Sequence, residues 1–313
     1  MSHSPSYLNT HGGFRGAWPA LLTPLDAQLR VDHDRFASHV KDRLAAGCGG
    51  VTLFGTTGEG ASFSLTERKE ALNQLIAHGV PAERIIVSTS CAALPEVSEL
   101  TRHALDHGVH GCLMLPPFFI KGVSDAGIIN SYAQIIDDIG ARDWRLYLYH
   151  IPQVSGVALS HDVIRTLLQR YPRVIAGLKD SGCQRPDSEG YARAFMPGTT
   201  VYVGNEPDLQ TLGRLGSTGA ISGLANFYSK CVTRMVLEPD TTQADRDTQR
   251  VLELLDIVRP YSLLPALKGI MAFLHKEPAW LRVRAPLVAL DAELYARLSA
   301  RLEAFAFDPA RES

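Results

Sequence analysis

The sequence has few cysteines and no excess of charge of one sign. Its 313 residues include five cysteines, an odd number with no CxxC pair, which indicates reduced thiols and not a disulfide framework. Lysine and arginine total 31 against 33 aspartates and glutamates, with no basic cluster. This balance argues against nucleic acid and anionic membrane surfaces as partners. No window approaches the ~18 apolar residues that a membrane-spanning helix needs.

The N-terminal tail also lacks a targeting pattern. Residues 1–13 are polar and do not show the basic and then apolar order of a signal peptide. Together with the reduced cysteines, this predicts a cytoplasmic protein. Hydrophobic residues make up 45% and charged residues 20%, so the composition is that of an ordinary folded chain and excludes a disordered one.

The sequence is rich in short apolar runs that alternate with longer segments of helical period. Eight such runs are candidate strands: Ala17–Leu22, Val51–Phe54, Ile85–Ser88, Cys112–Leu115, Leu146–Tyr149, Val174–Leu178, Thr200–Val203 and Gly219–Ser222. Helical segments between them include Asp34–Leu44, Leu65–Ala77, Glu96–Asp106, Ala126–Asp138, His161–Arg170 and Leu209–Leu215. Buried strands that alternate with amphipathic helices are typical of a parallel sheet. Eight of them predict a closed (β/α)8 TIM barrel, whereas six or fewer would suggest an open sheet.

The chain continues beyond the last expected strand with helical segments only. These are Phe227–Leu237, Gln243–Val258, Leu264–Leu274 and Ala292–Ala304. We therefore predict a flexible tail at 1–13, a barrel at 14–225 and a C-terminal helical segment at 226–313. In such barrels the chemistry lies at the carboxyl ends of the strands, so candidate residues are sought there.

A lysine closes the sixth expected strand. Lys179 follows the apolar run Val174–Leu178, and burial at this point would lower its pKa by disfavouring the ammonium form. An uncharged amine can attack a carbonyl carbon and form a Schiff base. A salt bridge to a carboxylate at the barrel rim is the alternative, and this feature alone favours neither.

A tyrosine closes the preceding strand. Tyr149 ends Leu146–Tyr149, so its phenol is expected near Lys179. Formation of a Schiff base requires proton transfers, which a phenol can perform. Taken alone, an amphipathic aromatic at the rim is the simpler interpretation.

A glycine-rich loop, Gly55–Gly60, follows the second expected strand. Its glycines allow backbone N–H groups to turn toward an anion, and the hydroxyls of Thr56 and Thr57 add donors, so one carboxylate would fit. The spacing matches neither a P-loop nor a dinucleotide-binding loop. The alternative is a tight turn before a helix that starts with the capping box Ser64–Glu67, with Glu59 as a structural hydrogen-bond acceptor.

Two further features have simpler explanations. His103 and His107 lie one helical turn apart, with His110 just beyond, but no third ligand is evident at a strand end, so a structural role is favoured over metal binding. The apolar run Pro116–Ile120 is either a core turn or an aromatic patch at a subunit interface.

These motifs, in this order, resemble the dihydrodipicolinate synthase/N-acetylneuraminate lyase family. The resemblance rests on Gly55–Glu59, Tyr149–Pro152 with Gly156, and Gly177–Asp180, with weaker matches at Val203–Glu206, Gly219–Ser222 and Arg284–Leu287. It extends from about Gly16 to Leu302, nearly the whole chain.

The resemblance implies a (β/α)8 barrel with C-terminal helices, often assembled as a homotetramer. By this analogy Lys179 forms a Schiff base with pyruvate or another 2-keto acid. Tyr149 is the acid/base phenol, and Thr56 and Thr57 hold the keto-acid carboxylate. No metal or organic cofactor is expected, because the protonated imine supplies the electrophile.

Four further residues are expected to contact substrate. Gly55 and Ile221 lie in matching motifs, whereas His150 and Glu206 are hypothetical contacts for the second substrate. Family members usually have asparagine at the position of His150.

Several departures from the family pattern bear on the substrate. Val154 replaces the arginine with which the synthases grip aspartate semialdehyde, and valine cannot replace a guanidinium, so 4-hydroxy-tetrahydrodipicolinate synthesis is disfavoured. Phe119 replaces a tyrosine that relays protons from the neighbouring subunit. Pro207 interrupts the acidic pair of the neuraminate lyases, with Asp208 following, and Gly223 replaces their serine, which weakens sialic acid as a substrate.

The sequence therefore predicts a lyase that cleaves, condenses or dehydrates a 2-keto acid, such as a deoxy sugar acid or a less polar aldol. A barrel that only binds keto acids, as a sensor, is the alternative of another class. Retention of Lys179, Tyr149, Thr56 and Thr57 argues against it. A metal-dependent aldolase lacks an evident ligand set.

Overall fold

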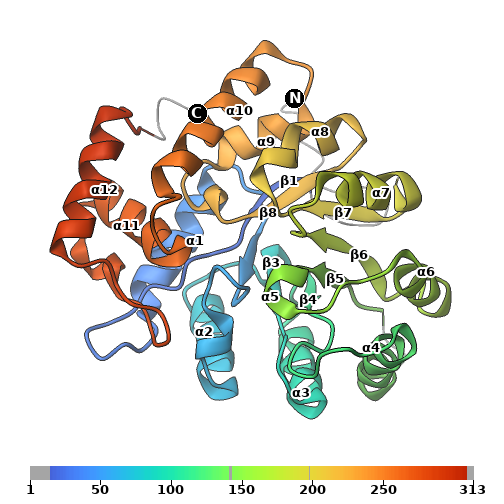
Figure 1. Cartoon of the computed structure of the whole chain (residues 1–313). Coiled ribbons are helices and arrows are strands. Elements are labelled where there is room, and N and C mark those ends of the chain that lie inside the picture. The colour runs from blue at the N-terminus through green and yellow to red at the C-terminus, as the bar shows by residue number, and fades with distance from the viewer. Residues whose placement is uncertain (1–14, 141–142, 197, 309–313) are drawn as a thin grey trace, which may run out of the picture.

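The computed structural model describes residues 15–140, 143–196 and 198–308, so the expected N-terminal tail lies outside the described residues. Eight parallel strands form one sheet in the order of the chain, with β8 returning to pair with β1. The seam between β1 and β2 carries a parallel bridge from Ala20 to Thr52 and a 3.0 Å hydrogen bond from the Leu21 N–H to the Thr52 carbonyl. The predicted (β/α)8 barrel is confirmed (Figure 1).

The elements follow the predicted alternation. The strands are β1 (Gly16–Pro19), β2 (Val51–Leu53), β3 (Ile85–Ser88), β4 (Gly111–Met114), β5 (Leu146–His150), β6 (Ile175–Asp180), β7 (Thr200–Val203) and β8 (Gly219–Ser222). The helices around them are α1 (His33–Ala45), α2 (Leu65–Ala77), α3 (Leu94–Asp106), α4 (Asp125–Ile139), α5 (Pro152–Ser155), α6 (His161–Arg170), α7 (Arg185–Phe195), α8 (Leu209–Arg214) and α9 (Ser229–Leu237). The C-terminal helices are α10 (Thr242–Val258), α11 (Leu263–His275) and α12 (Ala292–Ala304).

Side-chain caps explain where several helices begin. The side chains of six N-cap residues accept a backbone N–H from the first turn: Asp32, Ser64, Ser124, Ser160, Thr241 and Asp291. Each bond satisfies a donor that the helix itself leaves free. The expected capping box between Ser64 and Glu67 is present in both directions.

Large aromatic side chains fill the interior of the barrel. Trp18, Tyr147 and Tyr202 belong to one buried cluster, and the ring centroids of the two tyrosines are 5.4 Å apart. Glycine makes room for them: a Cβ on Gly50 would lie 2.4 Å from the Trp18 ring, and one on Gly219 would lie 3.0 Å from the Tyr202 ring. The interior is therefore a packed core, which leaves the carboxyl ends of the strands as the place for a site.

Helix α9 takes the position of the eighth helix of the barrel. It packs against β1 and β8, and Thr233 accepts the backbone N–H of Ala17 at 3.1 Å. The boundary predicted at residues 225 and 226 assigns this helix to the C-terminal segment; α9 packs against α10 as well as against the barrel strands, and the boundary stays a prediction. A pattern of helical residues alone does not reveal which strand a helix covers.

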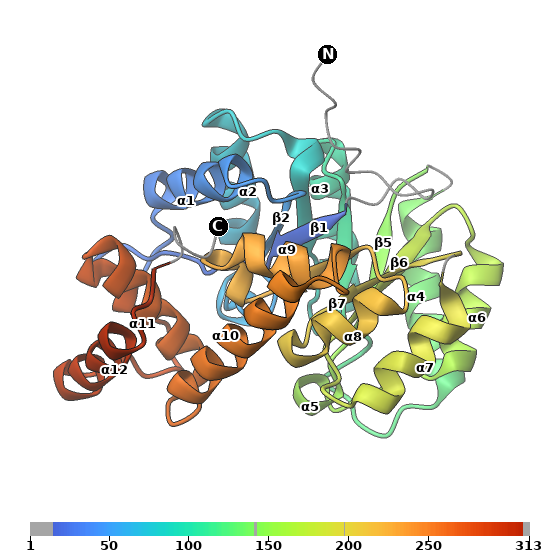
Figure 2. The same cartoon turned by 90° about the horizontal axis from the view of Figure 1, so that it is seen from above.

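Helices α10 to α12 gather on one side of the barrel, away from α4 and α6, in both views (Figures 1 and 2). They share a buried hydrophobic cluster with residues of β1, β7 and β8. Arg35 of α1 forms an ion pair with Glu277, which fixes the C-terminal segment to the first helix as well.

The membrane test on the described residues gives a mixed result. No single described helix is long and apolar enough to cross a bilayer, whereas α10 and α11 pass together on length and composition only and are bent by 110°. Both helices contribute to the buried C-terminal cluster.

Candidate active site

Lys179 and Tyr149 lie side by side at the carboxyl ends of adjacent strands. They are register partners on β6 and β5, and both side chains are buried. Lys179 Nζ is 3.2 Å from the Tyr149 hydroxyl oxygen, to which it donates, and 4.2 Å from the centre of the phenol ring. Lys179 belongs to β6, which extends to Asp180, two residues beyond the predicted end of the strand at Leu178.

The environment of Lys179 differs from that of a salt-bridged surface lysine. Its exposed fraction is 4%, and no carboxylate of the described residues lies within ion-pair distance of Nζ. The rim salt bridge that the sequence left open is therefore not formed within the described chain. A buried amine whose one hydrogen-bond partner among the described residues is a phenol is suited to act as a nucleophile.

The loop Gly55–Gly60 brings Thr56 to the same place. Thr56 Oγ1 lies 3.2 Å from the Tyr149 hydroxyl. Phe54 and Glu59 have positive φ angles of 53° and 56°, and a Cβ on Gly60 would lie 1.9 Å from the Phe54 carbonyl oxygen, so this turn tolerates only glycine there. The loop is held from the other side by the Thr23 hydroxyl, which donates to the Gly58 carbonyl at 2.8 Å.

The same loop retains unused donors. Neither the Thr56 N–H nor the Thr57 N–H donates a hydrogen bond to any of the described residues. Both side chains are half-buried, and Thr57 lies against Gly223, whose Cβ would be 3.5 Å from Thr57 Oγ1. Free N–H groups in a glycine-rich turn favour a bound anion.

A cavity of about 360 Å³ opens beside Tyr149 and Thr56. Its walls come from the loops after β2, β3 and β4, from α5, and from the C-terminal segment. The lining residues are Phe54, Gly55, Thr56, Glu59, Gly60, Ala61, Ser62, Ser88, Ser90, Leu115, Phe118, Tyr149, Val154, Ser155, Leu264, Pro286 and Leu287. Its volume is in the range of small-molecule sites, and it adjoins the lysine–tyrosine pair, so it is the candidate substrate cavity.

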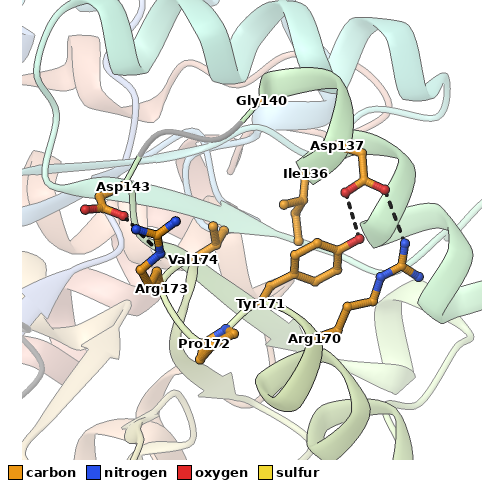
Figure 3. Close-up of a pocket in the computed structure, with 9 residues that line it drawn as sticks. All are labelled: Ile136, Asp137, Gly140, Asp143, Arg170, Tyr171, Pro172, Arg173 and Val174. Atoms are coloured by element: carbon orange, nitrogen blue, oxygen red, sulfur yellow. Dashed lines mark hydrogen bonds and ion pairs between the residues drawn. The ribbon is translucent and has the colours of Figure 1, made fainter.

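A second cavity of about 360 Å³ lies at the opposite end of β5 and β6 (Figure 3). Its polar groups already bind one another: Asp137 accepts from the Tyr171 hydroxyl at 2.9 Å and from Arg170 at 3.2 Å. Arg173 and Asp143 form a further ion pair at 3.6 Å. Residues at this end of a barrel contribute to stability. The lining of this cavity contains, among the described residues, no lysine, cysteine, serine or threonine side chain that could act as a nucleophile.

His150 is not brought to the substrate cavity. It follows Tyr149 on β5, so its side chain points to the opposite face of the strand, where it packs edge-on against Tyr191. Its Nδ1 accepts the Leu159 N–H at 3.1 Å, and burial lowers the pKa of the imidazole. An Nδ1 that accepts an N–H leaves Nε2 as the ring's donor. The predicted contact of His150 with the second substrate stays a prediction.

Glu206 and Ile221 also lie outside the lining of the cavity, as do Lys179 and Thr57. Glu206 Oε1 accepts from the Ser222 hydroxyl at 2.7 Å, beside the end of β8. Ile221 is buried in the interior cluster with the barrel tyrosines. Asp208, the second acid near Glu206, is committed to Arg185 at 2.7 Å. Their substrate contacts stay predictions.

Glu59 anchors the glycine-rich loop to the C-terminal segment. It forms a fully buried ion pair with Lys268 of α11, and its Oε2 accepts the Arg284 N–H at 3.1 Å. Lys268 also donates to the Arg282 carbonyl at 2.7 Å. Burial lowers the pKa of Lys268, and the charge of Glu59 opposes that shift. These contacts agree with the structural role that the sequence left open as the alternative for Glu59.

Removal of one partner of this pair should be costly. We expect Lys268→Met to lower the free energy of unfolding by about 3–5 kcal/mol, because it leaves a buried carboxylate without its counter-charge. Lys69→Met, which breaks the surface pair with Glu99, should cost less than about 1 kcal/mol. Equilibrium urea unfolding of both variants measures the difference. If both variants lost less than about 1 kcal/mol of unfolding free energy, the buried pair would not stabilise the fold as argued.

The histidines considered for metal binding have structural surroundings. The rings of His103 and His107 are tilted by 51° with their centroids 4.4 Å apart, and His110 bonds the Tyr147 hydroxyl at 2.9 Å below the site. Across the described ranges, the structure gathers no group of three or more histidine, cysteine, aspartate or glutamate side chains in reach of one ion. That the reaction requires no metal ion stays a prediction.

Comparison with known proteins identifies the family. Residues 13–305 match the model of the Dihydrodipicolinate synthetase family. The chain belongs to this family. The resemblance inferred from the sequence motifs is thus confirmed, over the length that the motifs had indicated.

Individual relatives agree with this assignment. The chain is 32% identical over 292 residues to an uncharacterized DapA-like lyase of Chloroflexus aurantiacus, covering 92% of this chain and 96% of that protein. The crystal structure of dihydrodipicolinate synthase from Agrobacterium tumefaciens has a TM-score of 0.87 at 32% identity, covering 94% and 99% of the two chains. Sialic acid aldolase of Ruminococcus gnavus shares the fold, with a TM-score of 0.84 at 19% identity and coverage of 99% of both chains. The protein is an enzyme of the lyase class.

Sequence reasoning missed much of the cavity wall. Ser88 and Ser90 lie at and just beyond the end of β3, where the rule for barrel sites would have found them. Leu264, Pro286 and Leu287 come from the C-terminal segment, and only the weak match at Arg284–Leu287 pointed toward the site. Phe118, not the neighbouring Phe119, turns to the cavity.

Proposed function

We propose that this enzyme is a class I lyase that forms a Schiff base between Lys179 and a 2-keto acid, with pyruvate as the product of cleavage or the donor in condensation. Membership in the Dihydrodipicolinate synthetase family supports a pyruvate-dependent lyase. The observation that carries the proposal is the buried Lys179 amine, 3.2 Å from a phenol and without a carboxylate partner among the described residues.

The first step joins enzyme and substrate. The unprotonated Lys179 amine attacks C2 of the keto acid and forms a carbinolamine. Tyr149 donates a proton to the carbinolamine oxygen, which leaves as water, and the nitrogen lone pair forms the protonated imine. The N–H groups and hydroxyls of Thr56 and Thr57 bind the substrate carboxylate and hold C2 near Nζ.

The second step breaks the carbon–carbon bond. In a 4-hydroxy-2-keto acid, the Tyr149 phenolate removes the proton of the C4 hydroxyl, and the C3–C4 electron pair moves into the protonated imine. This yields an aldehyde and a neutral enamine on Lys179. The enamine takes a proton at C3, and water releases pyruvate and regenerates the amine. The imine accepts the electron pair, so this route requires no separate cofactor.

The departures from the family pattern at Val154 and Phe119 limit which substrates and proton transfers the site can support. Val154 offers no cation for the carboxylate of aspartate semialdehyde, which argues against dihydrodipicolinate synthesis. Phe119 carries no hydroxyl for a relay, so the proton transfers fall to Tyr149 and Thr56.

We also propose that the enzyme is a homo-oligomer in the cytoplasm. Phe119 and Ile120 are adjacent on the β4–α4 connection, with exposed fractions of 78% and 67%. Adjacent apolar side chains with this exposure are typical of a surface that packs against another molecule.

Product analysis tests the proposed reaction. Incubation with 4-hydroxy-2-keto acids should release pyruvate and an aldehyde in equal amounts. A new 2-keto acid without an aldehyde would indicate dehydration, and binding without any product would indicate a keto-acid sensor.

A further inference from the structure

We propose that the cavity beside Tyr149 binds an uncharged, apolar group on the aldehyde side of the substrate, such as an alkyl or aromatic chain. This inference rests on the proposed function, which places an aldehyde at that position. It specifies which class of aldehyde the enzyme selects.

The walls next to the reacting pair are largely apolar. The aliphatic and aromatic residues of the lining include Leu115, Phe118, Val154, Leu264, Pro286 and Leu287. They come from the β4–α4 connection, from α5 and from the C-terminal segment. Apolar side chains therefore surround the cavity and are not confined to one wall. Burial of an apolar group against such walls is favourable by the area that it removes from water.

No positive charge faces this space. Within the described residues, no lysine or arginine lines the cavity. The nearby cations are engaged elsewhere: Lys121 donates to the carbonyls of Phe118 and Ser155, and Lys268 is paired with Glu59. Arg284 binds Glu67 at 2.5 Å. A second carboxylate would therefore lose its hydration without gaining a counter-charge.

Three of the serine hydroxyls of the wall are already engaged. The Ser155 hydroxyl donates to the Val157 carbonyl at 2.8 Å, and the Ser90 hydroxyl accepts the Leu115 N–H at 2.9 Å. Ser88 lies 3.4 Å from Ser90, oxygen to oxygen. A polyol chain would thus find fewer free partners than the number of wall hydroxyls suggests. These observations favour an apolar chain over an acidic or sugar-like one.

Val154 is the residue through which the preference can be changed. Its exposed fraction is 55%, so a longer side chain fits without disturbing the core. Val154→Arg introduces a cation into the cavity, and Val154→Leu keeps the wall apolar. Val288→Arg, at an 80% exposed position outside the lining, adds the same charge elsewhere and serves as the matched control.

The test compares three aldehydes of similar length in condensation with pyruvate: pentanal, succinic semialdehyde and erythrose. We expect wild type to prefer pentanal in kcat/KM by about tenfold or more over the other two. Val154→Arg should lower that ratio for pentanal against succinic semialdehyde by about tenfold. Val154→Leu and Val288→Arg should keep the wild-type order.

Reductive trapping of pyruvate on each variant separates the two proposals. A pyruvate adduct on Lys179 together with a preference for succinic semialdehyde or erythrose would overturn the apolar subsite alone. A kcat/KM ratio of pentanal to succinic semialdehyde that Val154→Arg leaves unchanged would also overturn it. Absence of the adduct from wild type would contradict the proposed function itself.

Discussion

Lys179→Met is expected to form no covalent adduct with pyruvate and to lose kcat by at least about 10⁴-fold, the order seen when a nucleophile is removed. Methionine matches the length of lysine and fills the same buried place, so the barrel should remain folded. The loss is large because Lys179 supplies the electrophile as well as the attachment: without the imine, the electron pair of the C3–C4 bond has no acceptor. Steady-state pyruvate release and circular dichroism measure activity and folding on the same sample.

The control for this variant is Lys230→Met, which replaces an exposed lysine on α9. It should retain wild-type kcat and the pyruvate adduct. Activity of Lys179→Met within about tenfold of wild type would mean that imine chemistry at Lys179 is not the route of the reaction.

Tyr149→Phe should lower kcat by about 10²–10⁴-fold, the usual contribution of a positioned acid or base. Its hydroxyl lies 3.2 Å from both Lys179 Nζ and Thr56 Oγ1, so the substitution removes the proton donor at the carbinolamine and the base at C4. The amine itself remains. We therefore expect pyruvate still to be trapped on Lys179 at long incubation times, but at a reduced rate.

Tyr147→Phe is the matched control. This tyrosine lies on the same strand, and its hydroxyl bonds His110 below the site. Its loss should cost about 1 kcal/mol of stability and leave kcat near wild type. If Tyr149→Phe also kept its kcat, another group would have to transfer the protons.

The reacting pair could be predicted from the sequence because two simple rules apply to it. Parallel strands end at the same edge of a barrel, so residues that close consecutive strands lie close together. Lys179 and Tyr149 are register partners as this rule requires. The capping box at Ser64 and the turn at Gly55–Gly60 depend on local sequence, and both were found as expected.

His150 was assigned to the site although the alternation of a strand argues against it. If Tyr149 faces the interior, its neighbour must face outward. The outward position of His150 therefore follows from the strand pattern, and its contact with the second substrate stays a prediction.

The cavity walls could not be predicted in the same way. Leu264, Pro286 and Leu287 reach the site through contacts between segments about 200 residues apart. The Glu59–Lys268 pair likewise joins the glycine-rich loop after β2 to helix α11. Hydrophobic periodicity carries no information on such long-range packing, so the proposed class of aldehyde rests on the cavity walls and not on the motifs.

The most direct test of the account is reduction of the wild-type enzyme with borohydride in the presence of pyruvate, followed by intact and peptide mass spectrometry. The account predicts one reduced pyruvate adduct per chain, located on Lys179, and none when pyruvate or borohydride is omitted. A pyruvate adduct on another lysine, or no adduct with pyruvate and longer 2-keto acids, would contradict it.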